Sequence, residues 1–85
     1  MPLTVRMDHR VNTSTAGLAL LDVARGPRTC IVRDRSEGGA RVRMARTDTV
    51  PNFFMLQIDK SLASEPFRPV VVVWRRPGEI GVAWS

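Results

Sequence analysis

The sequence predicts an all-β protein: a small six-stranded antiparallel β-barrel preceded by a flexible N-terminal arm. Apolar and polar residues alternate with a period of two, and turn signals separate short apolar stretches at intervals of roughly 8–14 residues. Proline and glycine interrupt the chain too often for a convincing helix. A chain of 85 residues holds one small core, and closing the sheet into a barrel removes exposed strand edges.

The N-terminal segment, residues 1–16, is polar and has no clean periodicity. Thr, Ser, Asn and Gly dominate residues 12–17. We expect residues 1–16 to form a flexible arm and residues 17–85 to form the barrel domain.

The first three expected strands are separated by the turn sequences "RGPR" and "SEGG". They are Leu18–Ala24, Thr29–Arg33 and Ala40–Arg46. Strict alternation places Cys30 and Val32 on one face of the second strand. The third strand alternates most cleanly. Its predicted inward residues are Ala40, Val42 and Met44, and its predicted outward residues are Arg41 and Arg43.

The last three expected strands follow the loop "TDTVPN" and are separated by the loop "DKSLASEP" and the tight turn "RPGE". They are Phe53–Ile58, Phe67–Arg75 and Ile80–Trp84. The predicted inward residues of the strand at 53–58 are Phe54, Leu56 and Ile58. Those of the strand at 80–84 are Ile80, Val82 and Trp84. The strand between them carries β-branched residues on both faces, so its pattern assigns no inward side.

Composition indicates a cytoplasmic protein with an anionic partner. The net charge is +5, and every basic residue except Lys60 is an arginine. The guanidinium fork grips a phosphate or a guanine edge through two parallel hydrogen bonds, although a GC-rich genome gives the same arginine bias. A single cysteine fits a reducing compartment. No signal peptide is visible, and the longest apolar run, Val70–Trp74, is far shorter than the roughly 18 residues of a membrane span.

Catalysis and metal binding are not expected. The inward phase of Cys30 makes it a small core residue rather than a nucleophile. His9 lies in the arm, where nothing rigid orients it as a general base. One histidine and one cysteine do not make a metal-ligand set, and no phosphate-binding glycine loop is present. We therefore expect no enzyme activity, no metal and no cofactor.

The aromatic residues argue against nucleic-acid binding. Arg41 and Arg43 share an outer face that could attract a phosphate backbone, but a solvated face explains them equally well. Binders of single strands usually present aromatic platforms, whereas this chain has no tyrosine. Trp74 and Trp84 are expected to pack in the core or at its rim, with a stacking role for Trp74 as the alternative.

Two short motifs suit a guanine nucleotide. The arm contains "RMDHR", which places Arg6 and Arg10 four residues apart, and the hairpin contains "DRSEGG" with Asp34, Ser36 and Gly39. Arginines neutralise phosphates and donate to the O6/N7 edge of guanine. An aspartate accepts from the N1–H and N2–H₂ edge, and a serine with a glycine turn cradles phosphate oxygens. We expect Gly39 to bring the backbone close and to adopt a positive φ. The simpler alternative is that the hairpin residues only shape the turn.

An Arg-x-x-x-Arg motif followed by Asp-x-Ser-x-x-Gly resembles the PilZ domain, a bacterial receptor module for cyclic di-GMP. The segments "TCIVRDRSEGGARVRM", "VPNFFMLQI" and "VVVVWRRPGEIGVAW" resemble successive strands of short PilZ domains, which are six-stranded barrels. The resemblance implies that the arm residues Arg6 and Arg10 clamp the ligand and that Asp34, Ser36 and Gly39 hold it from the barrel. In the family an arginine directly before the first motif favours a stacked ligand dimer. Val5 occupies that position, which favours one molecule per domain.

Three functions remain open from the sequence. The first is a stand-alone cyclic di-GMP receptor whose ligand orders the arm onto the barrel and which acts on a partner protein in trans, since 85 residues leave no room for an output domain. The second is a degenerate barrel that binds no nucleotide and acts as a protein-interaction adaptor. The third is a small basic barrel for RNA or DNA.

Overall fold

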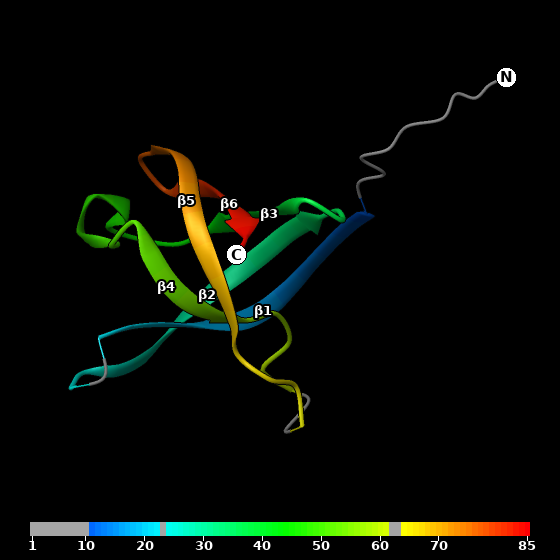
Figure 1. The fold of residues 1–85 in the computed structure, drawn as a ribbon, viewed down its shortest axis with the longest axis horizontal. Coiled ribbons are helices and arrows are strands. Elements are labelled where there is room, and N and C mark those ends of the chain that lie inside the picture. The colour runs from blue at the N-terminus through cyan, green and yellow to red at the C-terminus, as the bar shows by residue number, and fades with distance from the viewer. Residues whose placement is uncertain (1–10, 23, 62–63) are drawn as a thin grey trace, which may run out of the picture.

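A computed structural model describes residues 11–22, 24–61 and 64–85, with side chains from residue 14 onward. The chain forms a closed antiparallel barrel of six strands, in agreement with the predicted fold (Figure 1). The strands are β1 Val11–Asp22, β2 Gly26–Arg35, β3 Gly39–Arg43, β4 Phe53–Gln57, β5 Arg68–Arg76 and β6 Glu79–Trp84. The one helical element in the described ranges is a short 3₁₀ turn, η1 Thr47–Thr49.

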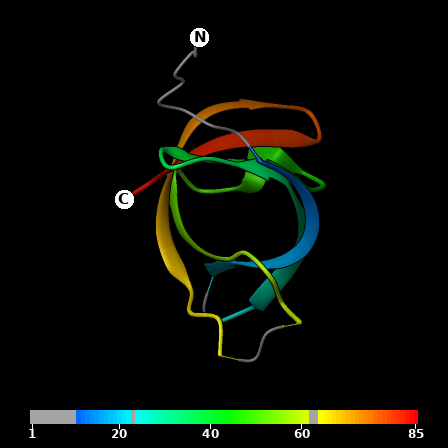
Figure 2. The same ribbon diagram turned by 90° about the vertical axis from the view of Figure 1, so that its right-hand side faces the viewer.

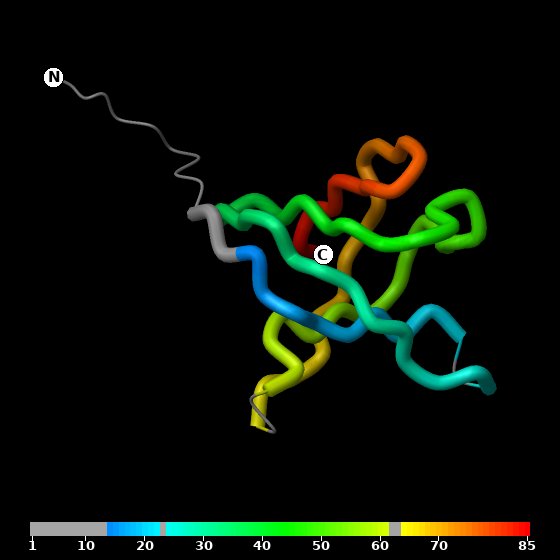
Figure 3. Tube along the Cα trace, turned by 180° about the vertical axis from the view of Figure 1, so that it is seen from behind, coloured from blue at the N-terminus to red at the C-terminus, as the bar shows by residue number. Residues whose placement is uncertain are grey.

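The strand order around the barrel is β1-β2-β3-β6-β5-β4, and the pairing of β1 with β4 closes the ring. Figure 2 shows this closure as a ring of ribbon, and Figure 3 shows β1, β2 and β3 crossing the back of the molecule side by side. The β5–β6 hairpin returns so that β6 lies between β3 and β5. The turn of the β2–β3 hairpin and the end of β6 are therefore neighbours.

The barrel core contains the predicted inward residues. Alternation correctly assigned those of the second, third, fourth and sixth strands, although Trp84 is only partly buried against the core. Cys30 is 2% exposed, and desolvation raises the pKa of its thiol to about 11. This burial fits the expectation of a core residue, since a thiol with so high a pKa is unreactive at neutral pH.

The first strand begins seven residues earlier than predicted, at Val11 rather than Leu18, and ends at Asp22. Residues 11–16 of the expected arm therefore belong to the sheet and pair with β2, while residues 1–10 lie outside the described residues. The prediction was wrong because the register shifts between Asn12 and Thr15, where Ser14 has a φ of 47°. Such an irregularity interrupts the alternation that identifies a strand.

The loop between β3 and β4 is fixed to β5 by hydrogen bonds. The Arg75 guanidinium donates to the carbonyl oxygens of Thr47 and Val50, both at 2.7 Å, and to Asn52 Oδ1 at 2.6 Å. Thr47 Oγ1 donates in return to the carbonyl of Arg76 at 2.7 Å. Among the described residues, no helix is long or apolar enough to cross a membrane.

Candidate functional site

The β2–β3 turn is held by Ser36 and by the end of β6. The Ser36 amide donates to the Gly39 carbonyl at 2.8 Å, and the Gly38 amide donates to Ser36 Oγ at 3.2 Å. The Trp84 indole donates to the Ser36 carbonyl at 3.0 Å, and the Trp84 amide donates to the Gly38 carbonyl at 3.1 Å. The turn is therefore a rigid part of the barrel wall. A hydroxyl that accepts one bond still has a proton to donate to a ligand.

Gly39 is required by a close approach of two strands. A Cβ at this position would lie 1.9 Å from the carbonyl oxygen of Val82 on β6. The expectation of a positive φ was wrong, because the described glycines with positive φ are Gly26 and Gly78. Gly39 thus lets β3 and β6 pair beside the turn, which is a structural reason for a glycine in the motif.

A β-bulge pairs Asp34 with Arg41 of β3, although Asp34 itself is buried at 6% exposure. Val32 pairs with Val42, but the next pair is Asp34 with Arg41, so Arg33 is an extra residue in β2. Strict alternation after Cys30 and Val32 would have directed the carboxylate into the core. The bulge instead brings Asp34 opposite Arg41, so the buried carboxylate forms an ion pair with the Arg41 guanidinium.

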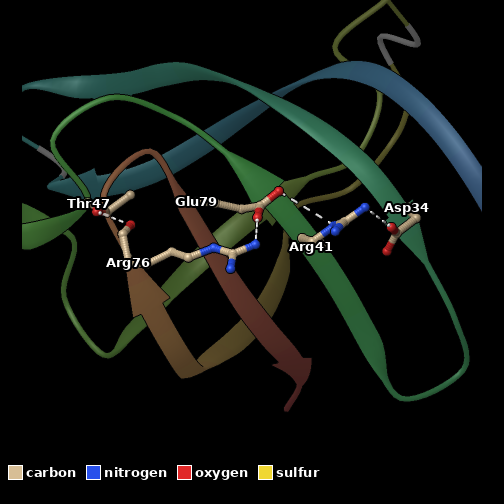
Figure 4. A network of polar contacts seen from close by, with 5 residues as sticks. All are labelled: Asp34, Arg41, Thr47, Arg76 and Glu79. Atoms are coloured by element: carbon tan, nitrogen blue, oxygen red, sulfur yellow. Dashed lines mark hydrogen bonds and ion pairs between the residues drawn. The ribbon is translucent and has the colours of Figure 1, made fainter.

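An ion-pair chain crosses the outer face of the barrel (Figure 4). Arg41 Nη2 lies 2.8 Å from Asp34 Oδ2, and Arg76 Nη2 lies 2.6 Å from Glu79 Oε1. The two pairs are linked only by a longer contact of 3.5 Å from Arg41 Nε to Glu79 Oε2, and this buried nitrogen makes no hydrogen bond in the described structure. The contact between Arg41 and Glu79 is therefore the weakest in the ion-pair chain. The contact between Arg41 and Asp34 is short, so Arg41 is the cation that positions the Asp34 carboxylate.

The hydrogen bond from Arg76 is the main reason that the pKa of Glu79 is below its ordinary value. The positive charges of Arg41, Arg76 and Arg33 act in the same direction, and burial opposes them. Glu79 is therefore a fixed negative charge among arginines at neutral pH.

A second bulge places Trp74 on the same outer face. Val72 pairs with Val82 and Trp74 pairs with Gly81, so Val73 is the extra residue in β5. A Cβ on Gly81 would lie 2.1 Å from the indole nitrogen of Trp74, which shows that the indole lies across the glycine. Trp74 is 41% exposed, and the Arg76 guanidinium lies 5.2 Å from the centroid of its ring.

The two bulges create one row of residues across four strands. Cross-strand pairing joins Asp34, Arg41, Gly81 and Trp74 in that order. This row borders a pocket of about 380 Å³, which Ser36 and Gly39 also line. The pocket thus combines a carboxylate, a guanidinium, a serine turn and an exposed indole face.

The three site residues predicted in the hairpin, Asp34, Ser36 and Gly39, all line this pocket. Arg6 and Arg10 lie outside the described residues, so their part of the prediction stays a prediction. Arg41 and Trp74 were not among the predicted site residues. The sequence signal for Trp74 was its position beside two arginines, and its expected packing in the core or at its rim was wrong because the bulge turns it outward.

No group of three potential metal ligands of the His, Cys, Asp or Glu type occurs within the part of the chain that the structure describes. The pocket lining combines the hydrogen-bonding groups of Asp34, Ser36 and Arg41 with the indole of Trp74 and with apolar side chains. Such an arrangement can bind a flat heterocycle that carries hydrogen-bond donors at its edge.

The fold and the pocket define a class of small closed β-barrels with a ligand-type pocket on the outer wall rather than inside the barrel. The family model of the PilZ domain matches residues 4–85. The chain therefore belongs to the PilZ domain family, as its two motifs indicated. A search of the curated proteins finds no match to the chain.

Proposed function

We propose that this protein is a cyclic di-GMP receptor of the PilZ family that acts on a partner protein in trans. The observation that supports this most directly is the convergence of Asp34, Ser36 and Gly39 with Trp74 on one pocket. The family is one of cyclic di-GMP-binding modules, and the proposal assigns the chain a binding role without a catalytic step.

The pocket groups have complementary tasks in this proposal. The Asp34 carboxylate accepts from the N1–H and N2–H₂ edge of a guanine, while Arg41 holds that carboxylate at 2.8 Å. The exposed indole of Trp74 lies across Gly81 and offers a stacking face for a base. Ser36 donates its hydroxyl proton to a phosphate oxygen or to the ribose.

The arm supplies the remaining charge. Arg6 and Arg10 are proposed to clamp the phosphates and a guanine edge when the arm orders over the pocket. The family match begins at residue 4 and so includes both arginines. With valine at position 5, we propose one ligand molecule per domain.

The test is a calorimetric titration of the purified full chain with cyclic di-GMP. We expect micromolar or tighter binding that Arg6→Ala and Arg10→Ala each weaken by about 1–3 kcal/mol, the range for a lost charge-assisted hydrogen bond. Arg25→Ala is the matched control, because its side chain is 83% exposed in the β1–β2 turn and does not line the pocket. This variant should bind like the wild type.

Two results would contradict the proposal. Absence of binding at high micromolar ligand would rule out the receptor. The remaining alternative would be a protein-interaction adaptor that binds no nucleotide, which the exposed apolar residues of β5 favour. Unchanged affinity in both arginine variants would remove the arm from the site. A nucleic-acid binder would instead hold generic oligonucleotides with an affinity that falls steeply with salt.

A further inference from the structure

A second pocket lies on the outer wall beside the β5–β6 turn, and arginines from three strands line it. Its volume is about 300 Å³, and it is bordered by Arg33, Arg43, Arg76, Pro77, Gly78 and Glu79. None of these residues lines the pocket at Asp34. We call Arg33, Arg43 and Arg76 the arginine cluster.

The register of the sheet brings the arginine cluster together around one carboxylate. Glu79 on β6 pairs with Arg43 of β3 on one side and with Arg76 of β5 on the other. Arg33 is the extra residue of the bulge in β2. The hydrogen bond from Arg76 lowers the pKa of Glu79, and the charge of Arg33 adds to this effect, so Arg33 also lies near this carboxylate.

Glu79 compensates only part of the positive charge. Its carboxylate lies 2.6 Å from Arg76 Nη2 and 3.5 Å from Arg41 Nε. Arg33 and Arg43 form no ion pair among the described residues. The pocket is therefore lined by three positive charges and one negative charge. Like charges on neighbouring strands repel one another, and an anion bound between them would remove this repulsion.

The arginine cluster has hydrogen-bond donors available for an oxyanion. Arg43 and Arg76 are exposed, and Arg33 is partly exposed. A guanidinium has five N–H donors, and Arg76 uses Nη2 to hold Glu79. Guanidinium groups bind phosphate oxygens through pairs of parallel hydrogen bonds. The net charge of the pocket lining matches that of a phosphate monoester, which is about −1.5 to −2 at neutral pH.

We propose that the arginine cluster binds a phosphate monoester group at a site separate from the cyclic di-GMP pocket. Arg33 and Arg43 supply the charge that Glu79 does not compensate, and Glu79 orients Arg76. The volume is at the lower end for ligand sites, which suits a phosphate with a small substituent. A phosphodiester, as in cyclic di-GMP, carries a single negative charge and matches the cluster less well. A small phosphate ester and a phosphorylated side chain both present the required chemistry.

The test is an NMR titration of the nitrogen-15-labelled full chain with inorganic phosphate. We expect saturable shifts of the Nε–H signals of the arginine cluster and of the Gly78 amide, with a dissociation constant of about 1 mM or lower. Sodium chloride at the same ionic strength is the control for charge screening and should not reproduce these shifts.

Charge-removing variants show whether the cluster holds the phosphate. Arg33→Gln and Arg43→Gln should each weaken phosphate binding about tenfold, as for the loss of one charge-assisted hydrogen bond. Arg25→Gln is the matched control, because its side chain is 83% exposed and does not line this pocket. It should leave phosphate binding unchanged. Circular dichroism melting confirms that each variant is folded.

Two further probes distinguish the sources of the phosphate group. Glycerol 3-phosphate represents a free phosphate ester, and a short peptide that contains phosphoserine represents a phosphorylated side chain. Both should shift the same signals as inorganic phosphate, whereas glycerol and the unphosphorylated peptide should not. The probe that binds more tightly identifies the source.

Three results would overturn the phosphate site. Shifts that sodium chloride reproduces, or that do not saturate, would mean that the arginine cluster is only a solvated face. Unchanged affinity in both Arg33→Gln and Arg43→Gln would place the phosphate elsewhere. Displacement of phosphate by saturating cyclic di-GMP would make the cluster part of the nucleotide site. Calorimetry of Arg43→Gln with cyclic di-GMP is expected to match the wild type, so the two sites fail independently.

Discussion

The outer wall of this barrel has two faces that differ in chemistry although the same fold builds both. The face made by β2, β3, β6 and the end of β5 carries the ion-pair chain from Asp34 to Arg76, in which the buried Arg41 Nε makes no hydrogen bond in the described structure. The face made by β4 and β5 carries Phe53, Val71 and Val73 with no polar partner among them. Val73 and Trp74 lie at the border, and both line the pocket of the first face.

The comparison shows that local irregularity of the backbone, rather than composition, defines the site. Both Asp34 and Trp74 reach the polar face because a bulge precedes each of them. The apolar face has a regular register between Phe53 and Leu56 on β4 and their partners on β5. Bulges commonly redirect side chains at functional sites, and here two of them converge on one pocket.

The largest expected effect concerns the polar face and its closest backbone contact. Gly39→Ala places a methyl group 1.9 Å from the Val82 carbonyl, so β3 and β6 must separate. We expect a loss of about 3 kcal/mol in the free energy of unfolding, which is a typical cost of overpacking against an unyielding neighbour. Chemical denaturation followed by tryptophan fluorescence measures it.

Gly38→Ala is the matched control for this prediction. The nearest atom to its added methyl is Ser36 Oγ at 4.0 Å, and its φ is not positive, so the change in stability should be below about 0.5 kcal/mol. Equal losses in the two variants would show that the turn, and not the approach of β3 to β6, requires glycine.

The second prediction concerns ligand binding at the border of the two faces. Trp74→Ala should weaken cyclic di-GMP binding by about 1–3 kcal/mol, because base stacking on an aromatic ring contributes in that range. Phe53→Ala removes an aromatic side chain of greater exposure from the other face and should leave the affinity unchanged. Calorimetry measures the affinity of both variants for cyclic di-GMP. A similar loss of affinity in both would mean that the effect of Trp74→Ala does not come from base stacking in the pocket.

Much of the fold followed from the sequence, because alternation identifies a strand and its buried side wherever the register is regular. The inward residues of β3 and β4 were correct for this reason. The start of β1 was missed at the irregularity around Ser14, and the outward position of Trp74 was missed because four consecutive valines give no phase.

The candidate site was only partly predictable. The spacing of Asp34, Ser36 and Gly39 identified the hairpin motif, since all three belong to one short segment. The partnership of Asp34 with Arg41 depends on which residue of β2 is the extra one, and alternation alone contains no such information. The same holds for the placement of Trp74 over Gly81, two residues that join only through the register of β5 with β6.

A smaller effect is expected from the ion-pair chain, and it should depend on pH. The pKa of Glu79 is lower in the folded protein than its ordinary value of 4.5. The carboxylate therefore contributes stability that is fully present above pH 4.5 and is lost as the pH falls through the folded pKa. Glu79→Gln should cost less than about 1 kcal/mol at pH 7, as for most ion pairs at a surface.

Thermal melting of the wild type and of Glu79→Gln between pH 7 and pH 3 tests this sign. The difference in melting temperature should shrink towards zero as the pH falls below 4.5. A difference that grows on acidification would mean that Glu79 destabilises the folded state in its charged form. Arg43→Gln provides a comparison, because Arg43 lies opposite Glu79 on β3 but makes no ion pair among the described residues.

The smallest effect is expected on the apolar face. Val71→Thr replaces one β-branched side chain with another at an outward position of β5, so the free energy of unfolding should change by no more than about 0.5 kcal/mol. The inward neighbour provides the contrast, because Val70 is fully buried and Val70→Thr introduces a hydroxyl into the core at a cost of about 1–3 kcal/mol. Denaturation curves of the two variants measure the difference. A loss at Val71 as large as that at Val70 would mean that the outward valines, and not only the inward ones, support the barrel itself.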